Sequence, residues 1–120
     1  MATLCAARLN ALGYKVVLYT YGSPRVGDKT WATQFDTIEY YRFVNNNDIV
    51  TTVPPHIDYT HVGELHYITY SGTMGDCSQW ARIRDKFKGY AKAFQKFQFF
   101  NGLYDHSINL YVDKLKRIVK

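Results

Sequence analysis

The segment "IEYYRFVNNNDIVTTVPP", residues 38–55, carries the strongest fold signal in the chain. Its first eight residues are mostly β-branched or aromatic, and they are long enough for a strand but too short for a core helix. Three asparagines then end the strand, because Asn tolerates turn and left-handed conformations. One carboxylate, Asp48, follows them, ahead of an apolar pair and two prolines. An aspartate here is usually a turn former, so a further role requires a partner.

Two other segments predict strands. Residues 14–22, "YKVVLYTYG", form a compact run typical of a buried strand, and residues 64–71, "ELHYITYS", alternate as a third. Helical patterns precede and follow them. The first helix is predicted to stop at Gly13, and the second begins at the N-cap Asp28 and runs to Phe35. The residues that recur at helical spacing in the first helix are Leu4, Ala7, Arg8, Leu9, Ala11 and Leu12.

Two more helices are predicted in the last third of the chain. Residues 80–100 combine six basic side chains with aromatic residues, and predict either a surface helix that approaches anionic lipid or a helix whose aromatic residues pack on the sheet. The final helix carries an apolar stripe at Ile108, Tyr111, Val112, Leu115, Ile118 and Val119. Helices alternating with strands indicate an α/β fold with a parallel sheet, whose active groups lie at the carboxyl ends of strands.

Bulk composition excludes several classes of protein. The chain has 120 residues, 47% of them hydrophobic and 17% aromatic, which suits one packed domain or part of one and not a disordered chain. No run reaches the roughly 18 apolar residues of a membrane span, and no signal peptide is evident. Cys5 and Cys77 fit neither a disulfide scaffold nor a zinc site. We expect Cys5 to be a buried thiol, and a Cys5–Cys77 bridge stays open.

Four histidines are candidate bases for Asp48. His66 lies within the third strand and is expected to be structural, and His56 flanks the two prolines. His61 is close enough in sequence to reach Asp48 locally. His106 lies before the final helix in "YDHSINLY", at a separation that allows two strand-end loops to meet.

An acid at a strand end followed by a histidine before a C-terminal helix has the chain order of α/β-hydrolases: Ser, then Asp, then His. In such a triad the histidine takes a proton from the nucleophile, and the carboxylate fixes its tautomer and stabilises the imidazolium. The pattern alone leaves open a turn aspartate and a helix-capping histidine.

Four segments together resemble the class 3 lipases, the fungal-type triacylglycerol lipases with an α/β-hydrolase fold. They are "YTYGSPRVGD", "YRFVNNNDIVTTVPP", "YTHVGELHYI" and "DHSINLY", in family order, and the resemblance covers most of residues 1–70 and 101–115. The resemblance implies that Asp48 is the catalytic acid and His106 the catalytic base. It also implies that a loop over Gly22, Ser23, Pro24 and Arg25 is structural, so Ser23 is not nominated as nucleophile.

The sequence departs from the family pattern in one large respect. The family's nucleophile lies in a GHSLGG-type elbow directly before a helix that begins like "MATLCAARL", and this chain starts just past that point. Residues 1–120 are therefore expected to be the C-terminal half of an α/β-hydrolase domain, without the nucleophilic Ser, the oxyanion hole and the lid.

Two functional hypotheses follow. The first is a class 3 lipase-type ester hydrolase that acts on acylglycerol esters at a lipid–water interface, needs no cofactor or metal, and requires its missing N-terminal half or self-association. The second is a non-catalytic remnant that binds a lipid surface or a partner protein. A nucleic-acid partner is not expected, because no recognised module accompanies the basic segment.

Overall fold

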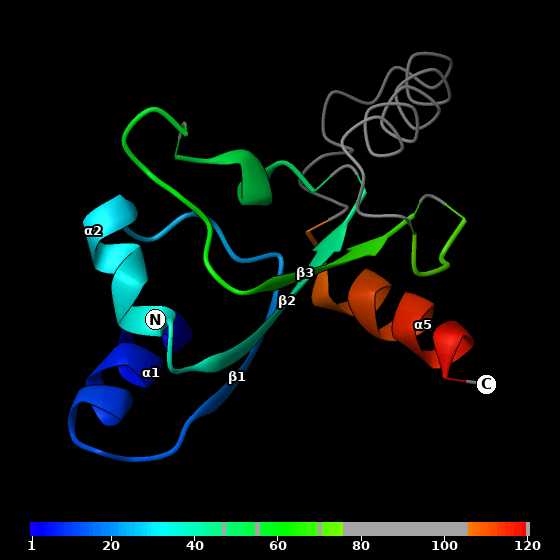
Figure 1. Cartoon of the computed structure of the whole chain (residues 1–120). Coiled ribbons are helices and arrows are strands. Elements are labelled where there is room, and N and C mark those ends of the chain that lie inside the picture. Colours follow the sequence, from blue (N-terminus) through cyan, green and yellow to red (C-terminus); the bar gives the residue numbers. More distant parts are fainter. Residues whose placement is uncertain (47, 55, 70, 76–105, 120) are drawn as a thin grey trace.

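Three parallel strands form the centre of the molecule (Figure 1). The structure is a computed structural model that describes residues 1–46, 48–54, 56–69, 71–75 and 106–119. The strands are β1 (Val17–Tyr21), β2 (Glu39–Asn45) and β3 (Glu64–Ile68), in the order β1-β2-β3. Both neighbouring pairs are parallel. The predicted α/β class and parallel pairing are therefore confirmed.

Helices lie on both sides of this sheet. Helices α1 (Ala2–Ala11) and α2 (Lys29–Ala32) lie together on one side, and α5 (Ile108–Ile118) lies on the other (Figure 1). The core on the α1 side consists of Ala6, Leu18, Phe35, Ile38 and Tyr40. Because strand side chains alternate between faces, Leu18 and Tyr40 turn toward this core while their chain neighbours turn away.

Helix α1 does not bury the face expected from its apolar period. Its buried residues are Thr3 and Ala6, whose small side chains allow close approach to the sheet. Cys5, one position away from Ala6, is exposed, so the expected buried thiol is wrong. The expected apolar face was also wrong, because it remains partly open, with Leu4 47%, Leu9 39% and Leu12 62% exposed.

The predicted ends of the first two helices are confirmed. Gly13 follows α1 with a φ of 87°, a left-handed conformation that suits glycine after a helix. The Asp28 carboxylate accepts a hydrogen bond of 2.7 Å from the backbone N–H of Trp31, as an N-cap does. Helix α2 then tightens into a 3₁₀ turn, η1 (Thr33–Phe35), and the rings of Trp31 and Phe35 pack 4.7 Å apart.

The sheet face turned toward α5 is only partly covered. In β1 the side chains on this face, Val17, Tyr19 and Tyr21, are 45%, 54% and 41% exposed, so β1 is buried on one face and not on both as expected. In α5 the buried residues are Tyr111 and Lys114. Much of the expected apolar stripe is open, since Ile108, Val112 and Val119 are 62%, 39% and 86% exposed.

Two sequence-based expectations fall outside the described residues. These are the helix over residues 80–100 and any bridge from Cys5 to Cys77. Within the described part of the chain, none of the helices has the length and apolar character that a membrane crossing requires.

Candidate active site

Asp48 lies three residues beyond β2, in a turn that its own side chain helps to close. Its backbone N–H donates to the carbonyl of Asn45 over 3.2 Å. Its Oδ1 accepts from the backbone N–H of Val50 at 2.9 Å, and its carbonyl accepts from the Thr51 hydroxyl at 2.8 Å. A 3₁₀ turn, η2 (Val50–Thr52), follows directly. Asp48 is therefore a turn former, but this role engages only part of its carboxylate.

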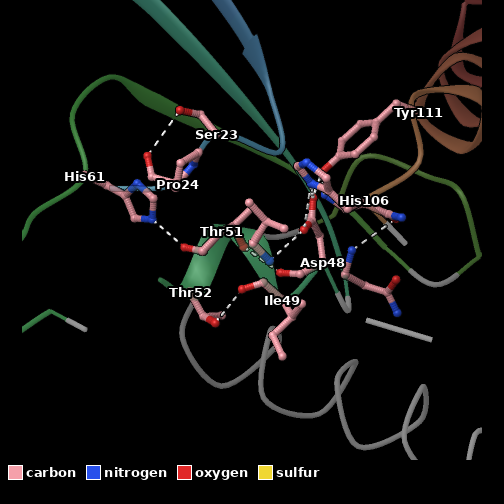
Figure 2. Close-up of polar contacts among 12 residues, drawn as sticks. Ser23, Pro24, Asp48, Ile49, Thr51, Thr52, His61, His106 and Tyr111 are labelled. Atoms are coloured by element: carbon pink, nitrogen blue, oxygen red, sulfur yellow. Dashed lines mark hydrogen bonds and ion pairs between the residues drawn. The ribbon is translucent and has the colours of Figure 1, made fainter. Parts of the chain in front are cut away.

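The imidazole of His106 contacts the rest of that carboxylate (Figure 2). Its Nδ1 lies 3.0 Å from Oδ2 and 3.1 Å from Oδ1 of Asp48. Because an ionised carboxylate only accepts, Nδ1 carries the proton in this contact and Nε2 is left as the acceptor nitrogen. The Asp48 side chain is fully buried, whereas that of His106 is 39% exposed. A buried carboxylate thus orients an imidazole that is partly open to solvent.

Tyr111 provides a further hydrogen bond to the acid. Its hydroxyl donates to Oδ2 of Asp48 at 2.6 Å and accepts from the backbone N–H of Asn45 at 2.9 Å. Asp48 thus accepts from Val50, His106 and Tyr111, which fixes both of its oxygens. The sequence pattern marked Tyr111 only as an apolar core position, and no sequence signal indicated these hydrogen bonds.

Gly22, directly after β1, makes room for the pair. Its φ is +66°, and a Cβ added there would lie 2.6 Å from Oδ2 of Asp48 and 2.7 Å from Nδ1 of His106. Its backbone N–H donates to the carbonyl of Phe43 over 3.0 Å, which continues the pairing of β1 with β2. The acid and the base therefore pack directly against a position that only glycine can occupy without displacing them.

Arg25 joins the loop after β1 to the loop that carries Asp48. Its Nη1 donates to the carbonyls of Thr52 and of Pro54, the latter at 2.7 Å, and its backbone N–H donates to the carbonyl of Val53 over 3.0 Å. These bonds give the loop over residues 22–25 the structural role implied by the sequence. The Ser23 hydroxyl donates to the neighbouring carbonyl of Pro24 at 3.2 Å (Figure 2).

The other histidines lie away from the acid. Nε2 of His61 is 2.8 Å from the carbonyl of Thr51, on the opposite side of η2 from His106 (Figure 2). His66 is paired with Glu64 at 3.3 Å, and His56 is exposed. The structure therefore brings His106, and not the local candidate His61, to Asp48. Among the described residues, no group of three or more acidic, His or Cys side chains could hold a metal ion.

Known proteins that are similar to this chain include several lipases. The family model for class 3 lipases matches residues 1–57. A lipase from Rhizomucor miehei is 46% identical over 55 residues, which are 43% of this chain and 15% of that protein. A secreted mono- and diacylglycerol lipase from Fusarium solani is 39% identical over 72 residues, 57% of this chain and 21% of that protein. The toxin TseL of Vibrio cholerae is 49% identical over 37 residues, 31% of this chain and 6% of that protein.

Solved structures give the same likeness. A triacylglycerol lipase whose catalytic centre is described as a serine protease triad superposes with a TM-score of 0.51 and 38% identity. The match covers 55% of this chain and 28% of that one. The triacylglyceride lipase of Rhizomucor miehei superposes with a TM-score of 0.50 and 41% identity, over 54% of this chain and 28% of that one. The chain thus spans less than a third of the length of each of these relatives and structures.

Proposed function

We propose, from the match of residues 1–57 to the class 3 lipase family and from the similar lipases, that the chain is part of a carboxylic ester hydrolase that acts on lipid esters. In this proposal Asp48 is the orienting acid and His106 is the general base. One observation carries it: a fully buried carboxylate holds the Nδ1 side of a half-exposed imidazole at 3.0 Å, at the carboxyl ends of parallel strands.

The two residues perform proton transfer. Nε2 of His106 takes the proton of a serine hydroxyl as its oxygen attacks the ester carbonyl carbon, and returns that proton to the alcohol when the C–O bond breaks. A water molecule then attacks the carbonyl carbon of the acyl-enzyme. Nε2 of His106 takes the proton of this water and returns it to the serine oxygen as the carboxylic acid product leaves. Asp48 remains ionised throughout, keeps the Nδ1–H tautomer, and stabilises the imidazolium that forms in each step.

We place the nucleophilic serine in polypeptide beyond these 120 residues. Ser23 donates to a neighbouring carbonyl, Ser71 lies 2.8 Å from the Thr69 hydroxyl, and Ser107 is the N-cap position of α5. None of these three has the strand-turn-helix setting of a nucleophile elbow, nor does the sequence around Ser78.

The test uses the chain expressed together with the coding sequence that precedes it in its gene, which we call the completed chain. Hydrolysis of p-nitrophenyl butyrate is measured for the wild type and for His106→Ala. We expect kcat to fall by about a millionfold, as removal of the base from such a triad does. His61→Ala is the matched control and should leave kcat within a few-fold of wild type. Measurable activity that is equal in His106→Ala and wild type would show that His106 is not the base, and a completed chain without any activity would support the non-catalytic hypothesis.

We further propose that the substrate is met at a lipid–water interface. The loop after Asp48 exposes apolar side chains, with Ile49 51%, Val53 48% and Ile57 83% exposed. Apolar residues that open to solvent in the loop that carries Asp48 support contact with acyl chains. Replacing the most exposed of them, Ile57→Ser, should lower hydrolysis of emulsified tributyrin several-fold while hydrolysis of the soluble nitrophenyl ester stays unchanged.

The half-covered sheet supports the proposal that further polypeptide packs on it. In the described part of the molecule β1 is an edge strand, and its Val17, Tyr19 and Tyr21 side chains are exposed. Apolar edge strands pair readily with another chain. The additional polypeptide is either the N-terminal half, in the same chain or in a second one, or another copy of this chain.

A further inference from the structure

Lys114 is a buried cation to which the proton-transfer mechanism assigns no role. It lies on α5, three residues after Tyr111, and is 9% exposed. A lysine is almost never this buried unless its ammonium group is paired or hydrogen-bonded. Its Nζ donates to Oδ1 of Asn45 at 2.5 Å and to the carbonyl of Thr69 at 3.3 Å. The ammonium group therefore ties α5 to the carboxyl ends of β2 and β3.

Asn45, the residue that Lys114 holds, organises the acid. Its carbonyl accepts from the backbone N–H of Asp48, and its own backbone N–H donates to the hydroxyl oxygen of Tyr111. Its Oδ1 also accepts from the backbone N–H of Asn46 at 3.1 Å. The position of Asn45 thus sets where the Asp48 backbone begins its turn and where the Tyr111 hydroxyl lies.

The Tyr111 hydroxyl links Asn45 to Asp48. A phenolic hydroxyl has one proton to donate, and because an ionised carboxylate only accepts, that proton goes to Oδ2 of Asp48. The backbone N–H of Asn45 donates to the same hydroxyl oxygen and so fixes where that oxygen lies. A displaced Asn45 would let the Tyr111 hydroxyl move, and Asp48 would lose one of the hydrogen bonds that hold it against His106.

We propose that Lys114 is a positioning residue of the active site: through Asn45 and Tyr111 it holds the Asp48 carboxylate in the orientation that accepts the hydrogen bond from His106. The inference rests on the proposed function for its catalytic meaning, but the geometry it asserts can be measured without any activity.

The experiment is NMR on the completed chain labelled with ¹⁵N. Two signals are followed: the low-field proton resonance of His106 Nδ1–H, which reports its hydrogen bond to Asp48, and the hydrogen-exchange rate of the Asn45 amide. In Lys114→Met we expect the His106 resonance to be lost or broadened. We expect exchange at Asn45 to rise roughly tenfold, as the weakening of one hydrogen bond does. The amides of Leu18 and Tyr40, near the amino ends of β1 and β2, should keep their wild-type rates.

Lys116→Met is the matched control, since Lys116 lies on the same helix and is exposed. It should leave both signals unchanged. Lys114→Gln, which keeps a donor too short to reach Asn45 fully, is a second variant for the case in which Met prevents folding, and it should change Asn45 in the same direction.

Three results would overturn the inference. These are an unchanged His106 resonance in both Lys114 variants, an equal rise in exchange at Leu18, Tyr40 and Asn45, and a wild-type chain without the His106 resonance. The second would show that Lys114 contributes only to global stability. An inactive completed chain that keeps the predicted NMR response would refute the proposed function and leave the inference standing.

Discussion

Gly22→Ala is the smallest change that should separate the acid from the base. The added Cβ would lie 2.6 Å from Oδ2 of Asp48, 2.7 Å from Nδ1 and 2.9 Å from Cε1 of His106. Ordinary van der Waals contact begins at 3.4 Å, so these atoms must retreat by roughly 0.8 Å. Asp48 is held by Val50 and Tyr111, and His106 is the more exposed partner, so the imidazole should move.

A retreat of that size lengthens the 3.0 Å contact between Nδ1 and Oδ2 beyond hydrogen-bond range. We expect kcat of the completed chain for p-nitrophenyl butyrate to fall about a hundredfold, as misplacements near 1 Å do. The left-handed φ of +66° adds a stability cost of about 1–2 kcal/mol, measured by urea unfolding.

Gly13→Ala separates these two effects. Gly13 also has a left-handed φ, of +87°, but an added Cβ there meets nothing within 4 Å. It should show a similar loss of stability with unchanged kcat. Full activity in Gly22→Ala, or an equal loss of kcat in both variants, would refute the reasoning.

Three further predictions concern other parts of the chain. The purified 120-residue chain should hydrolyse no nitrophenyl ester and should self-associate on a sizing column; turnover from a clean monomer that His106→Ala abolishes would show that the nucleophile lies within these residues. The hydrogen bond from Tyr41 to Glu39 raises the pKa of Tyr41 from 10.0 to about 12, so Glu39→Gln should lower that pKa and shift part of the tyrosine titration, followed by absorbance at 295 nm, to lower pH. Because the folded chain then holds this proton more tightly than the unfolded chain, the contribution of Tyr41 to stability is complete below pH 10 and is lost as the pH rises toward 12. Equal losses on emulsified and soluble ester in Ile57→Ser would contradict contact with a lipid surface.

The sequence predicted those parts of the fold that depend on local chemistry. Strands rich in β-branched and aromatic residues, the N-cap at Asp28 and the stop at Gly13 are dictated within a few residues of chain, and all are present. The pairing of Asp48 with His106, which 58 residues separate, was suggested by the chain order of the two residues and then by the family resemblance. Composition gave no reason to prefer His106 over His61.

The residues that hold Asp48 in place could not be predicted from the sequence in this way. Lysines are usually exposed, so nothing in the sequence marked Lys114 as buried, and an apolar stripe assigned Tyr111 to the core without its hydrogen bonds. Apolar periodicity also failed for α1, where the small residues Thr3 and Ala6 face the sheet and the leucines are partly exposed. In each case the tertiary neighbours decide which side of a helix is buried.

The central claim is that Asp48 and His106 act as one unit in ester hydrolysis, and a double-variant cycle in the completed chain tests it most directly. Asp48→Asn alone should lower kcat about ten-thousandfold, because the imidazole is then held in the wrong tautomer. His106→Ala alone should lower it further, and the double variant should be no worse than His106→Ala, since an acid that acts only through the histidine has nothing left to orient. A double variant whose loss equals the product of the two single losses would show that the residues act independently, and would contradict the account.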